Sequence, residues 1–385
     1  MLSVMNGKYI FLLIFILFSI PEVIFSQDNS IFFTRTEIID TNENKLSFDI
    51  KTTSFLKNNE YFGYGFQGWT GIGFMLRPKL IYQPAKTTLI EAGYFLEKFS
   101  GRNEFYHPLP LFRIRQKFSN SFELVFGQLY GSLEHKLSEP VYRFDRYYSD
   151  NVEYGIQFLF NNKYFHNDLW INWEKFIFYD DPFKEEFVLG NVAEFSFDLN
   201  DKINIIIPFH YTWTHAGGQI DRHDENRLRM MSLNNTMTGM EMQYKAKLKL
   251  IKKIGLSYSY YNYKAGANPP EGEKYHQLFN TGTGHYFKTN IDFGNIKIMA
   301  GYWKGHQFIA KRGEYLFESV YEHIQNDSQD DVILYTIKFI YDKKIKKNII
   351  FSLRSDLYYQ ERRNNFQYSY AFYFIYNDLF SLKKM

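Results

Sequence analysis

Apolar and polar side chains alternate with a period of two through almost the whole chain, and this alternation constrains the fold more than any other feature. In residues 202–213, KINIIIPFHYTW, every second residue from Ile203 to Trp213 is apolar or aromatic. His210 and Thr212 fall on the opposite face. Successive side chains of a strand point to opposite faces, which gives this period. The sequence therefore predicts strands that each lie between two different environments.

Tracing the alternation gives about sixteen stretches, joined by short and long connections in turn. The expected strands are 45–55, 70–83, 86–98, 110–118, 121–131, 151–160, 164–178, 187–199, 202–214, 236–250, 253–264, 283–293, 296–304, 331–343, 346–359 and 365–380. Bacterial outer-membrane barrels have this rhythm and an even strand count. The predicted fold class is all-β: a closed antiparallel transmembrane β-barrel of about 16 strands (roughly 14 to 18), with short periplasmic turns and long extracellular loops. The alternative is a secreted β-sandwich or propeller, whose strands also alternate.

Composition supports a barrel that faces lipid on one side and water on the other. Aromatic residues make up 20% of the chain, with 32 Tyr and 40 Phe, yet the mean hydropathy of −0.38 is polar. Barrels combine these properties because their outer faces are apolar and their inner faces polar. The chain has no cysteine, which excludes disulfides, thiolate metal sites and a cysteine nucleophile. The net charge of +3 gives no indication of nucleic-acid binding, and we expect no cofactor.

The two ends of the chain are expected to differ from the barrel, which should span residues 45–380. Lys8 precedes an apolar run from Tyr9 to Ile20, and the small residue Ser26 precedes a plausible cleavage point, so residues 1–26 are interpreted as a cleaved signal peptide. The alternative, a membrane anchor, is disfavoured because a run of about a dozen apolar residues is short for a membrane span. Residues 27–44 are expected to form a periplasmic lead or an extra strand, and residues 381–385 a C-terminal tail. No linker divides the chain.

The inward faces of the predicted barrel carry charges of both signs. A barrel of about sixteen strands is too wide for its wall side chains to fill, so these charges either set the field of a water-filled channel or brace the wall. The candidate wall residues of this lumen are Arg113, Arg115, Lys117, Glu241, Lys245, Lys247, Arg354 and Asp356.

The third long loop, Gly131 to Asp150, is the candidate functional element because it is long and charged. In strand count, loop alternation and the position of this loop, the chain resembles sixteen-stranded porins. That resemblance implies a loop that folds inward and narrows the bore. The alternative is an ordinary surface loop. The constriction residues would then be Glu134, His135, Lys136, Glu139, Arg143, Asp145 and Arg146.

A metal site is a further hypothesis. The fifth long loop and the strand before it contain residue types that bind metals, but without a compact ligand spacing. These residues are His210, His215, Asp221, His223, Asp224 and Glu225.

Enzymatic motifs are absent from the sequence. There is no GxSxG elbow, no HExxH and no Walker loop, so the chain is predicted not to be an enzyme. The alternative that remains is an outer-membrane lipase or deacylase whose site is on the outer wall. Ser257, Ser259 and His285 would be available for it.

The sequence also resembles barrels of Bacteroidetes-type bacteria. The likeness rests on the ending FSQ of the signal peptide, the richness in Lys, Asn, Ile, Tyr and Phe, and the segment DLWINWEKFIFYDDPFKEEF (168–187). It implies a location in the outer membrane. The predicted function is a porin-like channel for small hydrophilic solutes, and the alternative is a non-conducting scaffold, receptor or secretion-system component. The expected partners are outer-membrane lipid, such solutes, and a second copy of the chain or a surface protein.

Overall fold

The computed structural model describes residues 28–62, 67–179, 181, 183–217, 230–246, 248–267, 279–320, 328–361 and 364–384. The expected signal peptide, Lys247 and most of the fifth long loop lie outside these ranges. Among the described residues, none of the helices has the length and apolar character needed to span a membrane.

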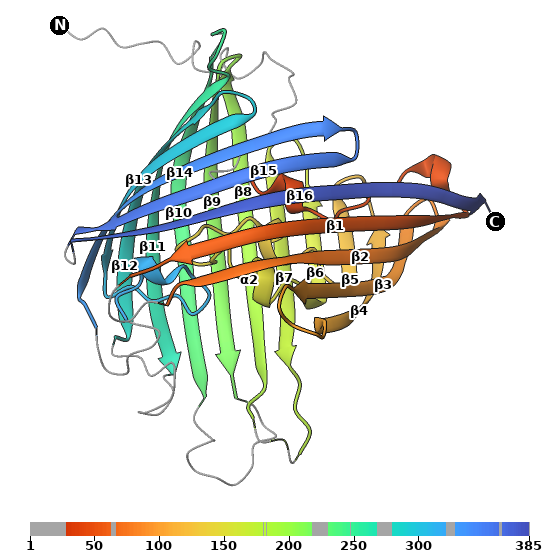
Figure 1. Cartoon of the computed structure of the whole chain (residues 1–385), viewed down its shortest axis with the longest axis horizontal. Coiled ribbons are helices and arrows are strands. Elements are labelled where there is room, and N and C mark those ends of the chain that lie inside the picture. Colours follow the sequence, from red (N-terminus) through yellow and green to blue (C-terminus); the bar gives the residue numbers. More distant parts are fainter. Residues whose placement is uncertain are drawn as a thin grey trace, which may run out of the picture.

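Sixteen antiparallel strands close into one barrel, which confirms the predicted fold class. Figure 1 shows the strongly tilted strands. Closure pairs β1 with β16, so the backbone hydrogen bonds continue around the ring and no edge meets lipid. The strands are β1 (Lys45–Glu60), β2 (Trp69–Ala85), β3 (Thr88–Phe99), β4 (Tyr106–Lys117), β5 (Phe122–Gln128), β6 (Tyr154–Asn161), β7 (Phe165–Lys175), β8 (Glu186–Asn200), β9 (Ile203–Ala216), β10 (Met231–Lys245), β11 (Lys253–Ala267), β12 (Thr281–Asp292), β13 (Ile296–His306), β14 (Asp331–Lys346), β15 (Ile349–Gln360) and β16 (Asn365–Lys384).

Both ends of the described chain differ from expectation. Residues 381–384, expected as a tail, continue β16, because Lys384 pairs with Lys45 where the first and last strands meet. Residues 28–44, expected as a periplasmic lead or an extra strand, form neither. They contain two short 3-10 helices, η1 (Ser30–Phe32) and η2 (Asp40–Asn42), and they lie inside the barrel.

The outer wall carries aromatic rows near both ends of the barrel. At the long-loop end, adjacent rings from β11 to β16 are 4.8–6.5 Å apart between centroids. Phe118, Phe122 and Phe158 form a similar row at the short-turn end. Such rows mark the two water–lipid interfaces of outer-membrane barrels. The long-loop row consists of Tyr258, Phe287, Tyr302, Tyr335, Tyr359 and Phe366.

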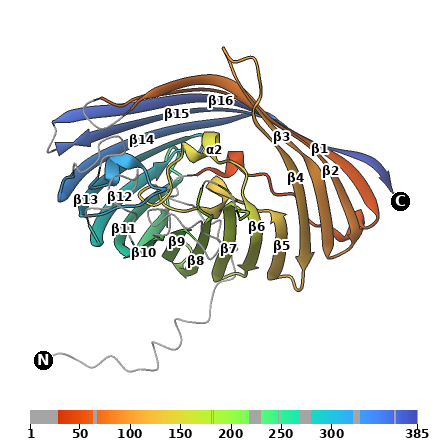
Figure 2. The ribbon, with the colours of Figure 1, turned by 90° about the horizontal axis from the view of Figure 1, so that it is seen from below.

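Three segments fill the interior: the N-terminal segment (28–44), loop 129–153, and residues 307–320 of the loop between β13 and β14, which is here called loop 307–330. Looking into the ring of strands, Figure 2 shows α2 (Arg146–Ser149) inside it. Loop 307–330 places Phe308 and Phe317, both fully buried, against Trp303 on the inner wall at 5.2 and 5.3 Å. Burying an aromatic side chain contributes about 1.5–3 kcal/mol, so this apolar packing fixes the loop inside the barrel.

Candidate functional site

The N-terminal segment is tied to the inner wall mainly through its backbone carbonyls. Lys51 Nζ donates to the carbonyls of Ile31 and Phe33 at 3.0 and 2.6 Å. Arg354 donates to Asn29 Oδ1 at 2.6 Å and to the Asp28 carbonyl at 2.8 Å. These cations of the inner wall therefore hold the N-terminal segment in place. Because they are bonded to it, they do not face an open channel.

Loop 129–153 is fixed by charged groups. The His135 imidazole is buried between Asp168, at 2.8 Å from Nδ1, and Glu153, at 3.0 Å from Nε2. Its ring stacks on Trp170 with centroids 3.5 Å apart. Further along the loop, Glu139 accepts from Lys338 Nζ at 2.6 Å. The loop therefore spans the lumen and contacts the wall at well-separated strands.

Loop 307–330 packs directly on loop 129–153. The Arg143 backbone N–H donates to the Arg312 carbonyl at 2.7 Å, and the Glu314 N–H donates to the Glu139 carbonyl at 3.0 Å. Lys311 adds an ion pair with Glu186 at 2.9 Å. Each of the two loops thus supports the other inside the barrel.

The residues predicted to line a constriction are engaged in these contacts. Arg113 pairs with Glu91 at 2.7 Å, Arg115 with Glu123, and Arg146 with Glu174 at 3.1 Å. Lys247 lies outside the part of the chain that the structure describes, and Lys245 is at the end of β10. The remaining positions are Lys117 beside the Ile38 carbonyl, Glu134 beside Thr34, Lys136 and Glu241 at an interior cavity, Asp145 near Lys57, Arg143 and Glu139 between the loops, Arg354 at Asn29, and Asp356 near Lys338.

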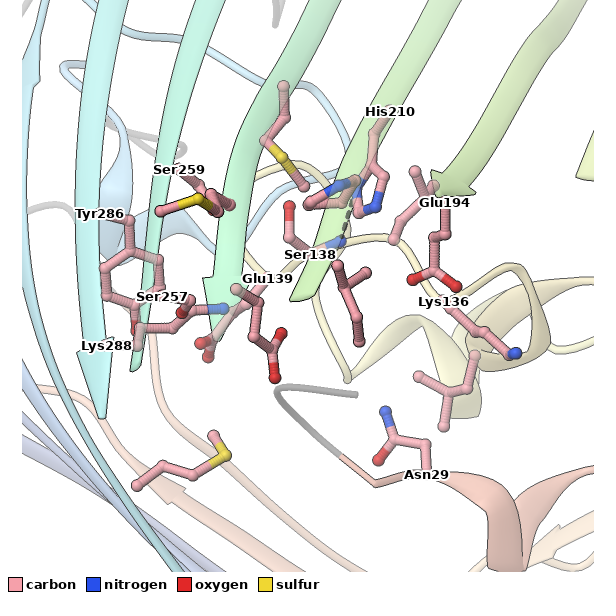
Figure 3. Close-up of a pocket in the computed structure, with 18 of the residues that line it drawn as sticks. Asn29, Lys136, Ser138, Glu139, Glu194, His210, Ser257, Ser259, Tyr286 and Lys288 are labelled. Carbon is pink, nitrogen blue, oxygen red and sulfur yellow. Dashed lines mark hydrogen bonds between the residues drawn. The ribbon is translucent and has the colours of Figure 1, made fainter. Parts of the chain in front are cut away.

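A cavity of about 70 Å³ remains in the middle of the lumen. Figure 3 shows Lys136 and Ser138 on the loop side, opposite Glu194 of β8 and His210 of β9. The Ser138 backbone N–H donates to His210 Nδ1 at 3.4 Å. A water needs roughly 10–15 Å³ in this measure, so the cavity holds a few water molecules and no lipid or oligosaccharide.

The buried His135 predicts a loss of stability at high pH. Burial opposes protonation of this imidazole, but the Asp168 and Glu153 carboxylates outweigh burial and raise its pKa from 6.5 to about 9. Because the folded pKa is above the unfolded one, the stabilisation is complete below about pH 6.5 and lost as the pH rises through about 9. It amounts to roughly 3 kcal/mol.

We expect the temperature at which the barrel unfolds, measured by its heat-dependent migration in SDS gels, to fall between pH 7 and pH 10. The control is His135→Gln, which has no titrating ring. Its unfolding temperature should be lower at pH 7 and nearly flat over this range. Equal pH dependence in both proteins would contradict the assignment.

The outer-wall group expected from Ser257, Ser259 and His285 does not form. Ser257 and Ser259 line the interior cavity, whereas His285 is on the outer face, where its Nδ1 is 2.9 Å from the Tyr258 hydroxyl. In the register of β11 and β12, Ser257 pairs with Lys288 and Ser259 with Tyr286, and all four residues line the interior cavity. His285 is next to Tyr286 in β12 and therefore points to the outer face.

A different serine and histidine meet on the outer wall. Ser232 of β10 is directly opposite His215 of β9 in the strand register. Both point outward, since their neighbours Met231, Leu233 and Ala216 are buried inside. Side chains directly opposite in an antiparallel pair have Cβ atoms about 4.5–5.5 Å apart. The register shift between Ser232 and Leu233 on the β11 side is a bulge, a feature that often re-aims a side chain next to a functional site.

The hydrogen bonds of His215 and Ser232 show which ring nitrogen of His215 carries the proton and which group donates to the serine hydroxyl. His215 Nε2 is 2.7 Å from the Gly217 carbonyl, and a carbonyl only accepts, so Nε2 carries the proton and Nδ1 keeps its lone pair. Nδ1 has no hydrogen-bond partner among the described residues. Gly217 has a φ of 105°, a conformation that favours glycine. The Trp213 indole N–H donates to Ser232 Oγ at 2.8 Å.

The pair belongs to an aromatic row at the long-loop end. Trp173, Phe187 and His215 follow one another in the register of β7, β8 and β9. Trp173 stacks on Phe187 with centroids 5.1 Å apart, and Phe187 lies 4.9 Å from His215. Ser232 is the next position in this row. The serine and histidine are therefore at the depth of the water–lipid interface.

The structure gives no support to the metal hypothesis. His210 lies inside the lumen and His215 on the outer wall, so the two do not face each other. Asp221, His223, Asp224 and Glu225 fall in a stretch outside the described ranges. Within those ranges, no group of three or more histidine or acidic side chains is placed to hold a metal ion.

Comparison with known proteins adds a family. The family model for lipid A 3'-O-deacylase-type proteins matches residues 38–385. A search of the curated proteins finds no match.

Solved structures with a similar fold include proteins of three bacteria, and one of them, OmpT, is an outer-membrane protein. OprD of Pseudomonas aeruginosa has a TM-score of 0.49 and 10% identity, covering 88% of this chain and 96% of that one. OmpT of Vibrio cholerae without its loop L8 has a TM-score of 0.49 and 11% identity, covering 86% and 99%. OccAB3 of Acinetobacter baumannii has a TM-score of 0.48 and 12% identity, covering 87% and 99%. At these identities and TM-scores the likeness says nothing about what the chain does.

Proposed function

Because this chain belongs to the lipid A 3'-O-deacylase-type family, we propose that it is an outer-membrane hydrolase that releases an ester-linked acyl chain from lipid A. The observation that carries this proposal within the structure is the outward-facing pair of Ser232 and His215 in an aromatic row at the long-loop end. Long loops of such barrels face the outside, and the acyl esters of a lipid lie where its headgroup meets its chains. The pair is thus at the depth of the bond to be cut.

The chemistry follows from the two hydrogen-bonding states. His215 Nδ1 is buried and is not hydrogen-bonded to Ser232 in this structure, so the two side chains first move together. Nδ1 then takes the proton of Ser232 as Oγ attacks the acyl carbonyl carbon, and a tetrahedral oxyanion forms. Collapse of this intermediate breaks the bond to the sugar oxygen, which receives the proton from His215. Water activated by the same nitrogen then releases the fatty acid and restores the serine.

Other outward groups next to the pair fit this chemistry. The Asn234 amide, which is opposite Trp213 in the register, offers an N–H donor to a developing oxyanion, while the Trp213 indole holds Ser232 Oγ. Lys264, the exposed partner of Asn234 on β11, provides a positive charge for an anionic headgroup. Gly266 leaves space beside the nucleophile, since a Cβ there would lie 3.1 Å from Ser232 Oγ.

The test is a direct assay of the purified, folded barrel. Hexa-acylated lipid A in mixed detergent micelles is incubated with the protein, and mass spectrometry follows the lipid. We expect the loss of one acyl chain and the release of free fatty acid. Lipid A that keeps all its acyl chains, with protein that binds the micelles and remains folded, would contradict the proposal.

A diffusion channel for small hydrophilic solutes is the second candidate. The observation that favours it is a pair of larger cavities, of about 540 and 350 Å³, with separate linings. The first lies between the two interior loops and β1 to β4, and the second lies near the turn that joins β4 and β5. The central cavity of about 70 Å³ shares no lining residue with either of them, so such a route would need the interior segments to move. If the interior segments are permanent, the barrel instead acts without conducting, as a scaffold or receptor would.

The location requires export of the chain. We propose that residues 1–26 are a signal peptide that is removed, so that the mature chain begins next to the N-terminal segment. Mass spectrometry of protein extracted from outer membranes should give a mass that lacks these residues. A full-length mass in correctly folded protein would contradict this assignment.

A further inference from the structure

The cavity of about 540 Å³ at the long-loop end is built like a binding site. It lies between β1, β2 and the loops 129–153 and 307–330, on the inner side of the wall. Small-molecule sites are typically about 300–1,000 Å³ and are lined by aromatic side chains with a few placed polar groups. The aromatic lining residues are Tyr61, Trp69, Phe99, Tyr106, Tyr148 and Tyr315.

Three lining residues each have a buried polar atom without a hydrogen-bond partner among the described residues. These atoms are Asn59 Oδ1, Arg143 Nη1 and Glu314 Oε1. Asn59 and Glu314 are only 3% and 5% exposed. A buried polar group that stays unpaired costs about 1–3 kcal/mol. Three of them around one cavity point to a ligand that supplies the missing hydrogen bonds.

The surroundings hold these three groups in position. The Asn59 amide donates to Asp145, and the same carboxylate oxygen accepts from Trp69 Nε1 at 2.9 Å. The Arg143 guanidinium stacks over the Tyr315 ring at 4.4 Å from its centroid. A site whose rotamers are fixed in this way loses little entropy when a ligand binds.

The lining carries hydrogen-bonding groups of both kinds and charges of both signs, Arg102 and Arg143 against Asp145. Burial raises the pKa of Glu314 to about 8, and the nearby Asp145 and Glu139 carboxylates contribute to the rise. Glu314 is therefore mainly neutral at pH 7 and offers both a donor and an acceptor. Arg143 adds a donor and Asn59 an acceptor, while the Asp145 carboxylate offsets part of the positive charge of Arg143 and Arg102. Hydroxyl groups, which both donate and accept, match this set, and sugar C–H faces match the rings.

We infer that this cavity binds a neutral saccharide of one or two rings. Residues from β1, β2, loop 129–153 and loop 307–330 all contribute to the site, so it exists only when both loops occupy the lumen. It lies on the inner side of the wall, whereas Ser232 and His215 lie on the outer side of β9 and β10. A substitution at one of the two sites should therefore leave the activity of the other site unchanged.

The test measures binding of maltose, cellobiose and chitobiose to the full mature barrel in detergent, by calorimetry and by intrinsic tryptophan fluorescence. We expect at least one of the three to bind and to change the emission of Trp69, with no such change in Trp69→Phe. Asn59→Ala and Arg143→Met should each weaken binding by about tenfold, since each removes one hydrogen bond to the ligand. Glu314→Gln should bind as the wild type does, because it keeps one donor and one acceptor.

Controls separate loss of the site from loss of the fold. Lys304→Met, on the exposed outer wall, should leave binding unchanged, and each variant should keep the gel migration of the folded barrel. The inference is overturned if none of the three disaccharides binds at millimolar concentration. It is equally overturned if binding is the same in folded Arg143→Met, or if glucuronate binds more tightly than all three.

Discussion

Ser232→Ala should abolish release of fatty acid from lipid A, with a fall in rate of roughly a thousandfold or more. The variant removes the only atom that attacks the ester carbonyl in the proposed mechanism, and it leaves the Asn234 donor in place. His215→Gln should cost a similar factor, because an amide cannot take up the serine proton. Removal of both should cost little more than either alone, since residues that act as a unit are not additive.

The matched control is Ser257→Ala, a serine of the neighbouring strand that faces the interior cavity. Rates are measured as free fatty acid released per unit time, by mass spectrometry, with protein of equal folded fraction. We expect the control to keep the wild-type rate. Full activity in folded Ser232→Ala would remove the proposed nucleophile, and equal losses in Ser232→Ala and Ser257→Ala would indicate damage to the barrel.

Deletion of residues 133–149 should raise the single-channel conductance of the barrel in planar bilayers by about tenfold or more, because a sixteen-stranded wall is too wide to fill its own lumen. This segment carries His135 and Arg146, which bind β7, and Glu139, which binds β14 across the interior. Without it, loop 307–330 loses the backbone partners at Arg143 and Glu139 that hold it in place. The wild type should conduct little in the same buffer.

The control is deletion of residues 101–104, in the exposed loop between β3 and β4. It shortens a loop of the same barrel and removes only Arg102 from the lining of the cavity at the long-loop end, while the interior segments keep their contacts, so conductance should stay near the wild-type level. High conductance in the wild type would favour an open channel over a barrel whose lumen is blocked. Low conductance after deletion of 133–149, in folded protein, would show that the remaining segments close the lumen by themselves.

The barrel could be predicted from the sequence because the pattern that indicates each strand is contained within a short stretch of residues. Alternation with period two reports the two environments of each strand, and the lengths of the connections report its topology. The strand starting at Met231 was expected only from residue 236, because Asn235 interrupts the apolar face. Ser232 was therefore assigned to a loop, and its partnership with His215 stayed hidden.

The outer-wall site and the filled interior depend on contacts between residues that are far apart in the sequence. Register across strands decides which side chains meet, and a shift by one residue moves every side chain to the other face. On β11 the inward face carries Tyr261 and Tyr263, so polarity did not reveal which way Ser257 and Ser259 point. The partners of His135, at Glu153 and Asp168, and the path of the N-terminal segment arise only once the ring is closed.

The N-terminal segment has a consequence for how the molecule is assembled. Its first described residue, Asp28, forms an ion pair with Lys297 of β13, and its carbonyl accepts from Arg354 of β15. The N-terminal segment is thus held by β13 and β15, two strands from the last part of the sequence. We expect this segment to enter the ring before β1 pairs with β16, so a bulky fusion ahead of Asp28 should slow the closure of the barrel.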